Sequence, residues 1–312
     1  MSGLFLGVDT SNYTTSVACV SEEGIVFERR TVLSVALGER GLRQSDALFQ
    51  HVLNLPPLLD ELFAGIDRKQ IQAIGVSAKP TAAKDSYMPV FLAGKLAASA
   101  ISNALDVPLL ETTHQAGHVR AAMLGKESEL ANQPFLAMHL SGGTTDLLKV
   151  TMIDGIMDSI ERIGSSGDLH AGQFVDRVGV RLGLPFPSGA ELERLARAAV
   201  DRSLRLPSSV KGSACSFSGQ ETQCRRYIEQ GMASETVAYA VYDCMARTFS
   251  KMLFSAVEHT GIKAILLSGG VSGSALLREL LESRMDQTLL YAGQGLSSDN
   301  AVGVALLAKD LS

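Results

Sequence analysis

The feature that most constrains the fold is a strand–turn–strand pattern that occurs twice. The first copy covers Leu4 to Val20 and has a polar turn at Asp9-Thr-Ser-Asn-Tyr13. The second covers Phe135 to Val150 and has a polar turn at Ser141-Gly-Gly-Thr144. A third strand is predicted after each copy, so the two units, about 130 residues apart, indicate an internal duplication. Two unrelated hairpins rich in Ser, Thr and Gly would give the same pattern.

Helical segments alternate with these strands. A helix is predicted over Gln44 to Phe63, interrupted near Pro56-Pro57, and Ala73 to Ser77 has the pattern of a buried strand. The last helix is expected to begin at Ser297-Ser-Asp-Asn300. The alternation predicts an α/β protein. Other predicted helices cover residues 172–182, 189–200, 220–229 and 234–260, and one begins near residue 275.

The length of 312 residues and the 46% of apolar residues favour two lobes, each with its own core. The predicted N-terminal lobe covers residues 1–112 and is completed by the C-terminal helix at 294–312. The C-terminal lobe covers 113–293. Four scattered cysteines indicate reduced thiols, and no export signal or membrane span is apparent, so a cytoplasmic protein is expected.

The net charge of -5 argues against a surface built entirely for nucleic acid. A local basic patch is the exception, although a solvated helix face is the favoured interpretation. The patch consists of Arg194, Arg197, Arg202, Arg205, Lys211, Arg225 and Arg226.

Two histidines lie four residues apart in Glu111-Thr-Thr-His-Gln-Ala-Gly-His118. On a helix capped by Thr112 or Thr113, His114 and His118 would face one side and could bind one metal ion. A packed or surface helix would also explain the spacing. Asp299, near the end of the chain, is the candidate third ligand, and two imidazoles with one carboxylate suit Fe²⁺ or Zn²⁺.

A glycine-rich segment, Gly269-Gly-Val-Ser-Gly-Ser274, follows a predicted buried strand and precedes a helix. Glycines allow a ligand close to the backbone, and a helix N-terminus favours anionic groups, so a nucleotide site is indicated. The segment lacks the lysine of a P-loop and the spacing of a dinucleotide fingerprint.

These motifs together resemble the tRNA threonylcarbamoyladenosine transferases, also known as glycoproteases, over nearly the whole chain. The resemblance implies the two-lobed actin/hexokinase/Hsp70-like ATPase fold, with duplicated mixed sheets flanked by helices. The supporting motifs are Asp9-Thr-Ser11, the His114 and His118 pair, Ser141-Gly-Gly143, Gly172-Gln-Phe-Val-Asp-Arg177, Pro187-Ser-Gly189, Ser216-Phe-Ser-Gly219, Ser268-Gly-Gly-Val-Ser272 and Ser298-Asp-Asn300.

The resemblance also implies a site and an activity. It assigns the divalent metal to His114, His118 and Asp299, and it implies metal-dependent transfer of threonylcarbamoyl from its adenylate to a tRNA adenine. Asp9 and Thr14 are the catalytic candidates. tRNA and a family-type protein partner, or a second copy of the chain, are the implied partners. The implied pocket for an adenine nucleotide or acyl-adenylate consists of Leu140, Ser141, Gly142, Gly143, Thr144, Asp176, Gly189, Gly269, Gly270 and Ser274.

The chain departs from the family pattern at several positions and is interpreted as a divergent paralogue. Asn12-Tyr13-Thr14 stands where the family has Cys-Asp-Glu, Thr144 replaces a histidine, and Ser274 replaces an asparagine. Two alternatives therefore stay open: carbamoyl transfer from carbamoyl-adenylate to another acceptor, and a non-catalytic nucleotide-binding scaffold. An endopeptidase is not supported, because His114 lacks the adjacent glutamate of His-Glu-x-x-His proteases.

Overall fold

The computed structural model describes residues 3–11, 13–35 and 42–312. Asn12, one of the departures from the family pattern, therefore lies outside the described residues. Packing divides the chain into two compact units. The first comprises Met1–Leu124 with Gly293–Ser312, and the second comprises Gly125–Ala292.

The first unit is built on a five-stranded mixed sheet in the order β3-β2-β1-β4-β5. β1, β2 and β3 form an antiparallel meander, whereas β4 and β5 run parallel to β1. All residues of β1 and β2 are buried, because helices cover both faces of the central strands. The strands are β1 (Leu4–Asp9), β2 (Thr14–Ser21), β3 (Gly24–Val32), β4 (Ile71–Lys79) and β5 (Leu109–Thr113).

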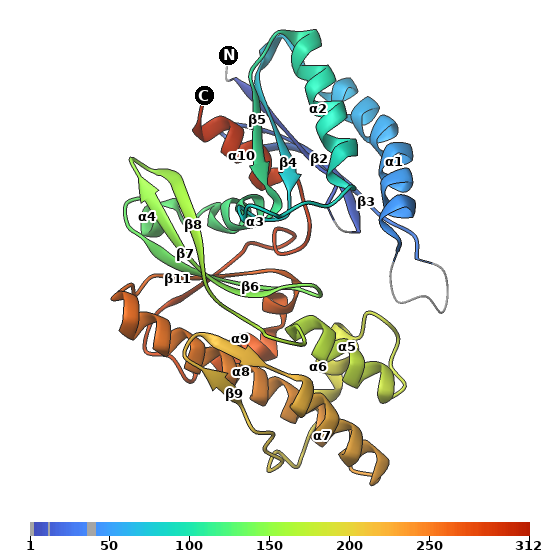
Figure 1. Ribbon diagram of the computed structural model, residues 1–312, viewed down its shortest axis with the longest axis vertical. Coiled ribbons are helices and arrows are strands. Elements are labelled where there is room, and N and C mark those ends of the chain that lie inside the picture. The colour runs from blue at the N-terminus through green and yellow to red at the C-terminus, as the bar shows by residue number, and fades with distance from the viewer. Residues whose placement is uncertain (1–2, 12, 36–41) are drawn as a thin grey trace. The chain divides into compact units, whose positions relative to one another are not determined.

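Helices α1 (Gln44–Gly65) and α2 (Phe91–Leu105) cover one face of this sheet (Figure 1). Helix α10 (Val302–Asp310) covers the other face and packs against α3 (His114–Met123). A β-carbon on Gly303 would lie 1.8 Å from the carbonyl oxygen of Gly117. The two helices therefore touch backbone to backbone, which brings the segment before α10 next to α3. A short 3₁₀ helix, η1 (Arg68–Gln70), precedes β4.

Two helix predictions were wrong. Helix α1 is continuous through Pro56 and Pro57. The carbonyls that these prolines leave without an amide partner belong to Val52 and Leu53, which are exposed, so water can satisfy them. Helix α10 begins at Val302, because Asn300 Oδ1 accepts a hydrogen bond from the Val302 amide at 3.0 Å, and Asp299 therefore belongs to the preceding loop.

The second unit repeats the sheet design in the order β12-β11-β6-β7-β8. β6, β7 and β8 form the meander, and β11 and β12 add parallel to β6 in the way that β4 and β5 add to β1. This common strand order confirms the predicted duplication. The strands are β6 (Phe135–Leu140), β7 (Thr145–Ile153), β8 (Ile156–Ser165), β11 (Ile265–Ser268) and β12 (Leu289–Tyr291).

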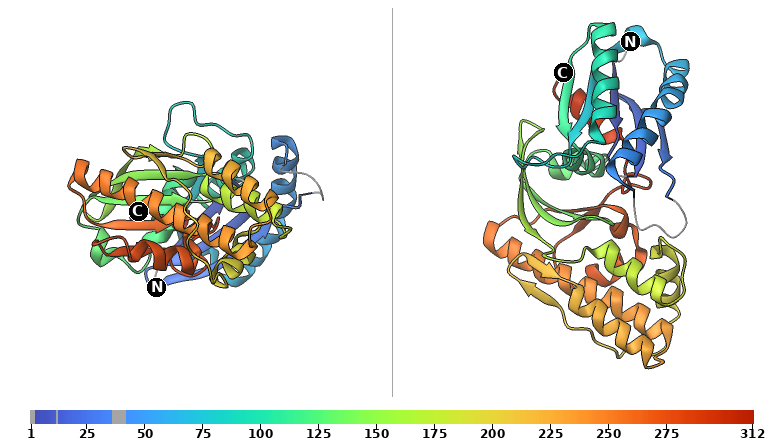
Figure 2. Two further views of the ribbon diagram at one scale, coloured as in Figure 1. Left: turned by 90° about the horizontal axis from the view of Figure 1, so that it is seen from below. Right: turned by 45° about the vertical axis from the view of Figure 1, so that its right-hand side comes forward.

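Helices α5 to α9 gather on one side of the second sheet (Figure 2). The core between them includes Phe217, whose ring centroid lies 5.3 Å from that of Phe174 and 5.9 Å from that of Phe249. Among the described residues, no helix is both long and apolar enough to cross a membrane. The remaining elements are α4 (Glu127–Leu130), α5 (Ala171–Arg181), α6 (Gly189–Arg197), β9 (Ser209–Lys211), β10 (Ala214–Ser216), α7 (Ser218–Glu229), α8 (Ser234–Thr260), η2 (Gly270–Gly273) and α9 (Ala275–Glu282).

Candidate metal and nucleotide sites

The two histidines of the motif lie on the first turns of α3. β5 ends at Thr113, whose side chain caps the helix by accepting a hydrogen bond from the Ala116 amide at 3.0 Å. Thr113, one of the two predicted caps, therefore sets where the helix begins. The i and i+4 spacing then brings the Nε2 atoms of His114 and His118 to 3.0 Å from each other.

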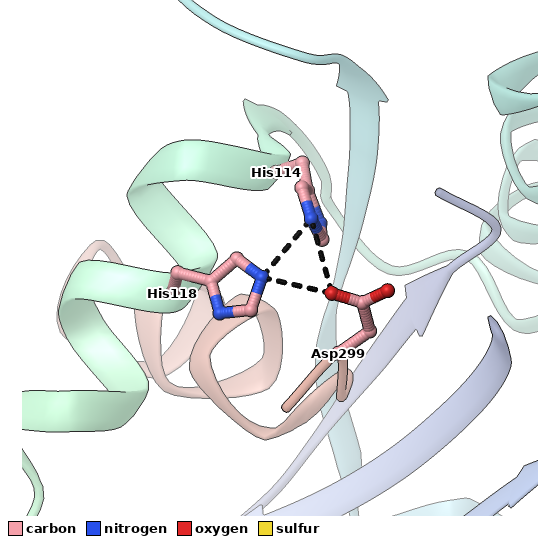
Figure 3. Close-up of side chains that lie close together, drawn as sticks. All are labelled: His114, His118 and Asp299. Atoms are coloured by element: carbon pink, nitrogen blue, oxygen red, sulfur yellow. Dashed lines mark hydrogen bonds and ion pairs between the residues drawn. The ribbon is translucent and has the colours of Figure 1, made fainter. Parts of the chain in front are cut away.

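Asp299 lies in the loop before α10, and its carboxylate points toward the imidazole rings of His114 and His118 (Figure 3). Its Oδ1 lies 3.1 Å from His118 Nε2 and 3.5 Å from His114 Nε2. Arg30 of β3 holds this loop, because its Nη1 donates to Ser298 Oγ at 2.6 Å and to the Asp299 carbonyl at 3.3 Å. The three side chains belong to the first unit, although two of them lie about 180 residues from the third.

The donor set fits a divalent metal ion. One ligand atom from each of His114, His118 and Asp299 lies within 4.8 Å of the other two. Donor atoms placed about 2.0–2.2 Å from one ion lie roughly 3 Å apart, which matches the separations of 3.0, 3.1 and 3.5 Å. Two imidazole nitrogens and one carboxylate oxygen leave coordination positions for a substrate oxygen or water.

The histidines and carboxylates of this site shift one another's pKa values. Burial alone would lower the pKa of His114, but the carboxylates of Asp9 and Asp299 raise that pKa to about 10. Burial would raise the pKa of Asp299, but hydrogen bonds from His114 and His118 hold it well below its usual value. A protonated His114 ring thus lies between the carboxylates of Asp9 and Asp299.

The catalytic candidate Asp9 lies at the end of β1 and is fully buried. Its Oδ2 lies 3.0 Å from His114 Nδ1, the ring nitrogen opposite the candidate metal position. Sequence patterns did not indicate this contact, because Asp9 lies in β1 and His114 lies in α3, 105 residues further along the chain. Thr14, the other catalytic candidate, begins β2 and is buried.

In the second unit, the predicted nucleotide residues gather at the ends of β6 and β11. Leu140 ends β6, and residues 141–144 form the turn to β7, closed by a 2.8 Å hydrogen bond from the Ser141 amide to the Thr144 carbonyl. A β-carbon on Gly172 of α5 would lie 2.6 Å from Gly142 Cα, so the start of α5 touches this turn. Gly269 follows β11 beside Leu140, and Gly270 begins η2.

Of the other three nucleotide candidates, Asp176 lies in the middle of α5, Gly189 begins α6 and Ser274 directly precedes α9. Asp176 Oδ1 accepts a hydrogen bond from the Ser188 amide at 2.7 Å, next to Gly189 at the start of α6. Burial raises the pKa of Asp176, and the Ser188 amide partly offsets this. Ser274 caps α9 by accepting from the Leu277 amide. The hydroxyl of Tyr242 donates to the Gly189 carbonyl at 3.0 Å and also bonds Ser274, so it links these two residues.

Two further polar groups lie near these turns. His139 Nδ1 is 3.1 Å from Ser268 Oγ, and this buried contact joins β6 to β11 just before the glycine-containing turn that follows each strand. Sequence patterns did not predict the contact between His139 and Ser268, because the two residues lie on apolar strands that are far apart in the chain. Asp168 receives hydrogen bonds from the Ser218 hydroxyl and the Phe217 and Ser218 amides. Burial would raise the pKa of Asp168, but these donors lower it.

The predicted basic patch is largely neutralised by acidic partners. Arg197 bonds Glu279 at 2.8 Å, Arg194 bonds Glu191 at 2.9 Å, and both pairs are exposed. Arg225 lies 3.9 Å from Glu229. The favoured interpretation of a solvated helix face is consistent with these ion pairs.

A comparison with protein families matches residues 38–306 to the tRNA N6-adenosine threonylcarbamoyltransferases. Two proteins of that description, from two strains of Thermus thermophilus, are each 30% identical to this chain over 310 residues. The alignments cover 97% of this chain and 91% and 90% of the relatives. The chain belongs to this family. The resemblance inferred from the motifs is therefore confirmed.

Solved structures show the fold of this threonylcarbamoyltransferase family member. HypF from T. kodakarensis superposes with a TM-score of 0.65 at 15% identity, covering 99% of this chain and 47% of HypF. This chain therefore spans about half the length of HypF. A ROK family glucokinase from Streptomyces griseus, solved with glucose and AMPPNP, has a TM-score of 0.57 at 15% identity and covers 98% of this chain. The fold is that of the actin/hexokinase-like ATPases, as predicted.

Proposed function

We propose that this chain catalyses metal-dependent transfer of a threonylcarbamoyl group from threonylcarbamoyl-adenylate to an adenine of tRNA. The observation that carries the proposal is the meeting of His114, His118 and Asp299 at one point in a member of the threonylcarbamoyltransferase family. A tRNA substrate and the buried, unpaired thiols of Cys19, Cys215, Cys224 and Cys244 support a cytoplasmic location.

The metal ion, when bound, would act as a Lewis acid that orients and polarises the acyl phosphate. His114 and His118 would hold it through Nε2, and Asp299 through Oδ1. Fe²⁺ and Zn²⁺ both suit this donor set. The three side chains come from α3 and the loop before α10, and their ligand atoms already lie within 4.8 Å of one another, so little rearrangement is needed to bind the ion.

The residues of the second unit would bind the adenylate. The turn at residues 141–144 offers main-chain amides, and Gly269 and Gly270 allow a phosphate close to the backbone at the end of β11. Ser274 and Gly189, joined through Tyr242, lie at the N-termini of α9 and α6, where helix dipoles favour an anion.

The proposed reaction needs no protein nucleophile. The exocyclic amine of adenine attacks the carbamoyl carbon, the bond from that carbon to the phosphate oxygen breaks, and AMP leaves with the bonding electrons. The amine proton passes to solvent or to the departing phosphate. Binding and orientation of the two substrates are then the main contributions of the protein.

A protein partner is also proposed, because helices α1 and α2 expose apolar side chains on their outer face. Leu96 is 73% exposed, Phe49 is 63% exposed and Leu53 is 57% exposed. We propose a second copy of the chain as the partner at this face. Sedimentation of the pure protein should give a dimer, and Leu96→Glu should shift it to a monomer. A monomeric wild-type protein would exclude self-association and leave a different protein as the partner.

The activity test combines metal-loaded protein, threonylcarbamoyl-adenylate and unmodified tRNA, with modified nucleosides measured by mass spectrometry and AMP measured separately. Threonylcarbamoyl-adenosine in the tRNA is the expected product, and His114→Ala should abolish it. Arg29→Ala, which removes an exposed ion pair to Glu61, is the control that should retain it. AMP release with another acceptor and no tRNA product would favour the carbamoyltransferase alternative. Nucleotide binding without AMP release would favour the scaffold alternative.

A further inference from the structure

We infer that Asp9 is a positioning residue, whose carboxylate fixes the tautomer and orientation of His114 so that Nε2 faces the metal; this rests on the metal site proposed above. Asp9 would then contact neither the substrate nor the metal. Its contribution to the reaction would pass through the His114 imidazole ring.

The carboxylate of Asp9 is held on both oxygens. Oδ2 accepts a hydrogen bond from Ser11 Oγ at 2.8 Å and lies 3.0 Å from His114 Nδ1. Oδ1 accepts from the Ser11 amide at 3.2 Å. Asp9 is 0% exposed, so these contacts are shielded from competing water.

The turn that carries Asp9 is anchored independently of the histidines. Thr10 Oγ1 donates to the Val90 carbonyl at 2.9 Å and accepts from the Gly94 amide at 3.0 Å, which ties the turn to the start of α2. The position of the Asp9 carboxylate is therefore set by β1 and α2, while the position of His114 is set by α3.

A carboxylate accepts hydrogen bonds, so the 3.0 Å contact requires the proton of His114 to be on Nδ1. A neutral imidazole with its proton on Nδ1 has its ligating lone pair on Nε2. Nε2 is the atom that lies 3.0 Å from His118 Nε2 and 3.5 Å from Asp299 Oδ1. Asp9 thus selects the one neutral tautomer that can bind the ion, and a carboxylate partner also strengthens the ligand's basicity.

The other roles for Asp9 fit the geometry less well. Within the part of the chain that the structure describes, the group of mutually close donor atoms consists of His114, His118 and Asp299, without Asp9. A general base must reach the proton that it removes, whereas Asp9 is buried and both of its oxygens already accept hydrogen bonds.

The first experiment measures Zn²⁺ affinity by competition with a chromophoric chelator, which requires neither tRNA nor acyl-adenylate. Asp9→Ala should weaken binding by about 10–100-fold. Asp9→Asn should lose less Zn²⁺ affinity, because its amide oxygen can still accept a hydrogen bond from Nδ1–H of His114. Thr15→Val is the matched control: it removes two hydrogen bonds of a buried threonine on the neighbouring strand β2, to His51 and Asn54, leaves the Asp9 turn intact, and should stay within about threefold of wild type. Melting curves of the metal-free variants establish that each is folded.

Equal Zn²⁺ affinity in Asp9→Ala and wild type would overturn the inference, as would equal losses in Asp9→Ala and Asp9→Asn. If His114→Ala loses Zn²⁺ while Asp9→Ala retains it, the metal site stands and only the role of Asp9 fails. If His114→Ala binds Zn²⁺ as well as wild type, the metal site itself fails.

The second experiment observes the tautomer directly. Long-range ¹H–¹⁵N spectra of Zn²⁺-loaded protein labelled in its 6 histidines should show His114 protonated at Nδ1. His114→Gln identifies the resonances. Asp9→Ala should shift the Nδ1 resonance, because its hydrogen-bond acceptor is gone, whereas Thr15→Val should leave it in place. A His114 ring protonated at Nε2 in the wild-type protein would overturn the inference.

Discussion

Gly269 and Leu140 approach so closely that a β-carbon on Gly269 would lie 2.3 Å from the Leu140 carbonyl oxygen. Gly269 also has a φ of +87°, which side-chain-bearing residues rarely adopt. Both constraints act where β6 and β11 end and their polar turns begin. The shape of the proposed nucleotide pocket therefore depends on the absence of one methyl group.

Gly269→Ala is expected to lower the free energy of unfolding by about 2–4 kcal/mol, from the positive φ and the clash with Leu140. ATP affinity should also fall, because the turn must move. Gly270→Ala is the stability control: it is exposed, with nothing near its β-carbon, and it should change the free energy of unfolding by less than about 0.5 kcal/mol. Urea denaturation and calorimetric titration measure the two effects. Equal stability of both variants would contradict this account.

Arg30→Met should weaken metal binding without removing a ligand. Arg30 ties β3 to the loop that presents Asp299, through Gly295, Ser298 and the Asp299 carbonyl. We expect an affinity loss of several-fold, smaller than that of Asp299→Asn. Arg29→Ala, which changes the adjacent exposed side chain, is the control. Metal titrations that give the same affinity for Arg30→Met and Arg29→Ala would show that the loop needs no such support.

Stability of the metal-free protein should depend on His114. The folded-state pKa of His114 is raised to about 10, above an unfolded value of about 6.5. A raised pKa stabilises the folded protein fully below pH 6.5, and this stabilisation disappears as pH rises through about 10. Urea denaturation in chelator between these values should show a decline that is weaker in His114→Gln. The same slope in both proteins would argue against the charged imidazole.

The four cysteines should not react with a disulfide reagent in the native protein. Burial raises the pKa of Cys215 and Cys224 to about 12, and that of Cys19 and Cys244 to about 11. Near pH 8 their thiolate fraction is negligible, and burial also blocks access of the reagent. Titration in guanidinium chloride should recover all four thiols. Rapid modification of a native thiol would indicate local opening around that residue.

Asp243→Ala should be strongly destabilising. This carboxylate is 1% exposed in the middle of α8 and bonds Arg205 at 2.6 Å, Arg284 at 2.7 Å and Arg247 at 2.8 Å. Its loss leaves the partly buried guanidinium groups of Arg247 and Arg284 without their anion, at a cost of about 3 kcal/mol. Glu279→Ala removes an exposed pair with Arg197, which water and salt screen, and should be far less destabilising. Thermal denaturation that ranks the two variants equally would contradict the prediction.

Local sequence patterns were sufficient for most of the fold. The two meanders, the long helix at Ser234–Thr260 and the cap at Thr113 were predicted from apolar periodicity and capping residues. The duplication followed from the repeated polar turns. The prediction failed at Pro56-Pro57, where the freed carbonyls belong to exposed residues that water can reach. It also failed at the start of α10, where Asn300 provides the turn.

By itself the sequence determined which residue types could bind a metal and a nucleotide, because the i and i+4 histidines and the glycine-rich turns are local patterns. Only the tertiary structure decided that Asp299 meets both imidazoles, that Arg30 supports its loop, and that Asp9 contacts His114 Nδ1. These contacts join segments far apart in the chain, and they depend on the backbone-to-backbone packing of Gly117 against Gly303. Residue spacing carries no information about such distances, whereas the packing of helices on a common sheet fixes them.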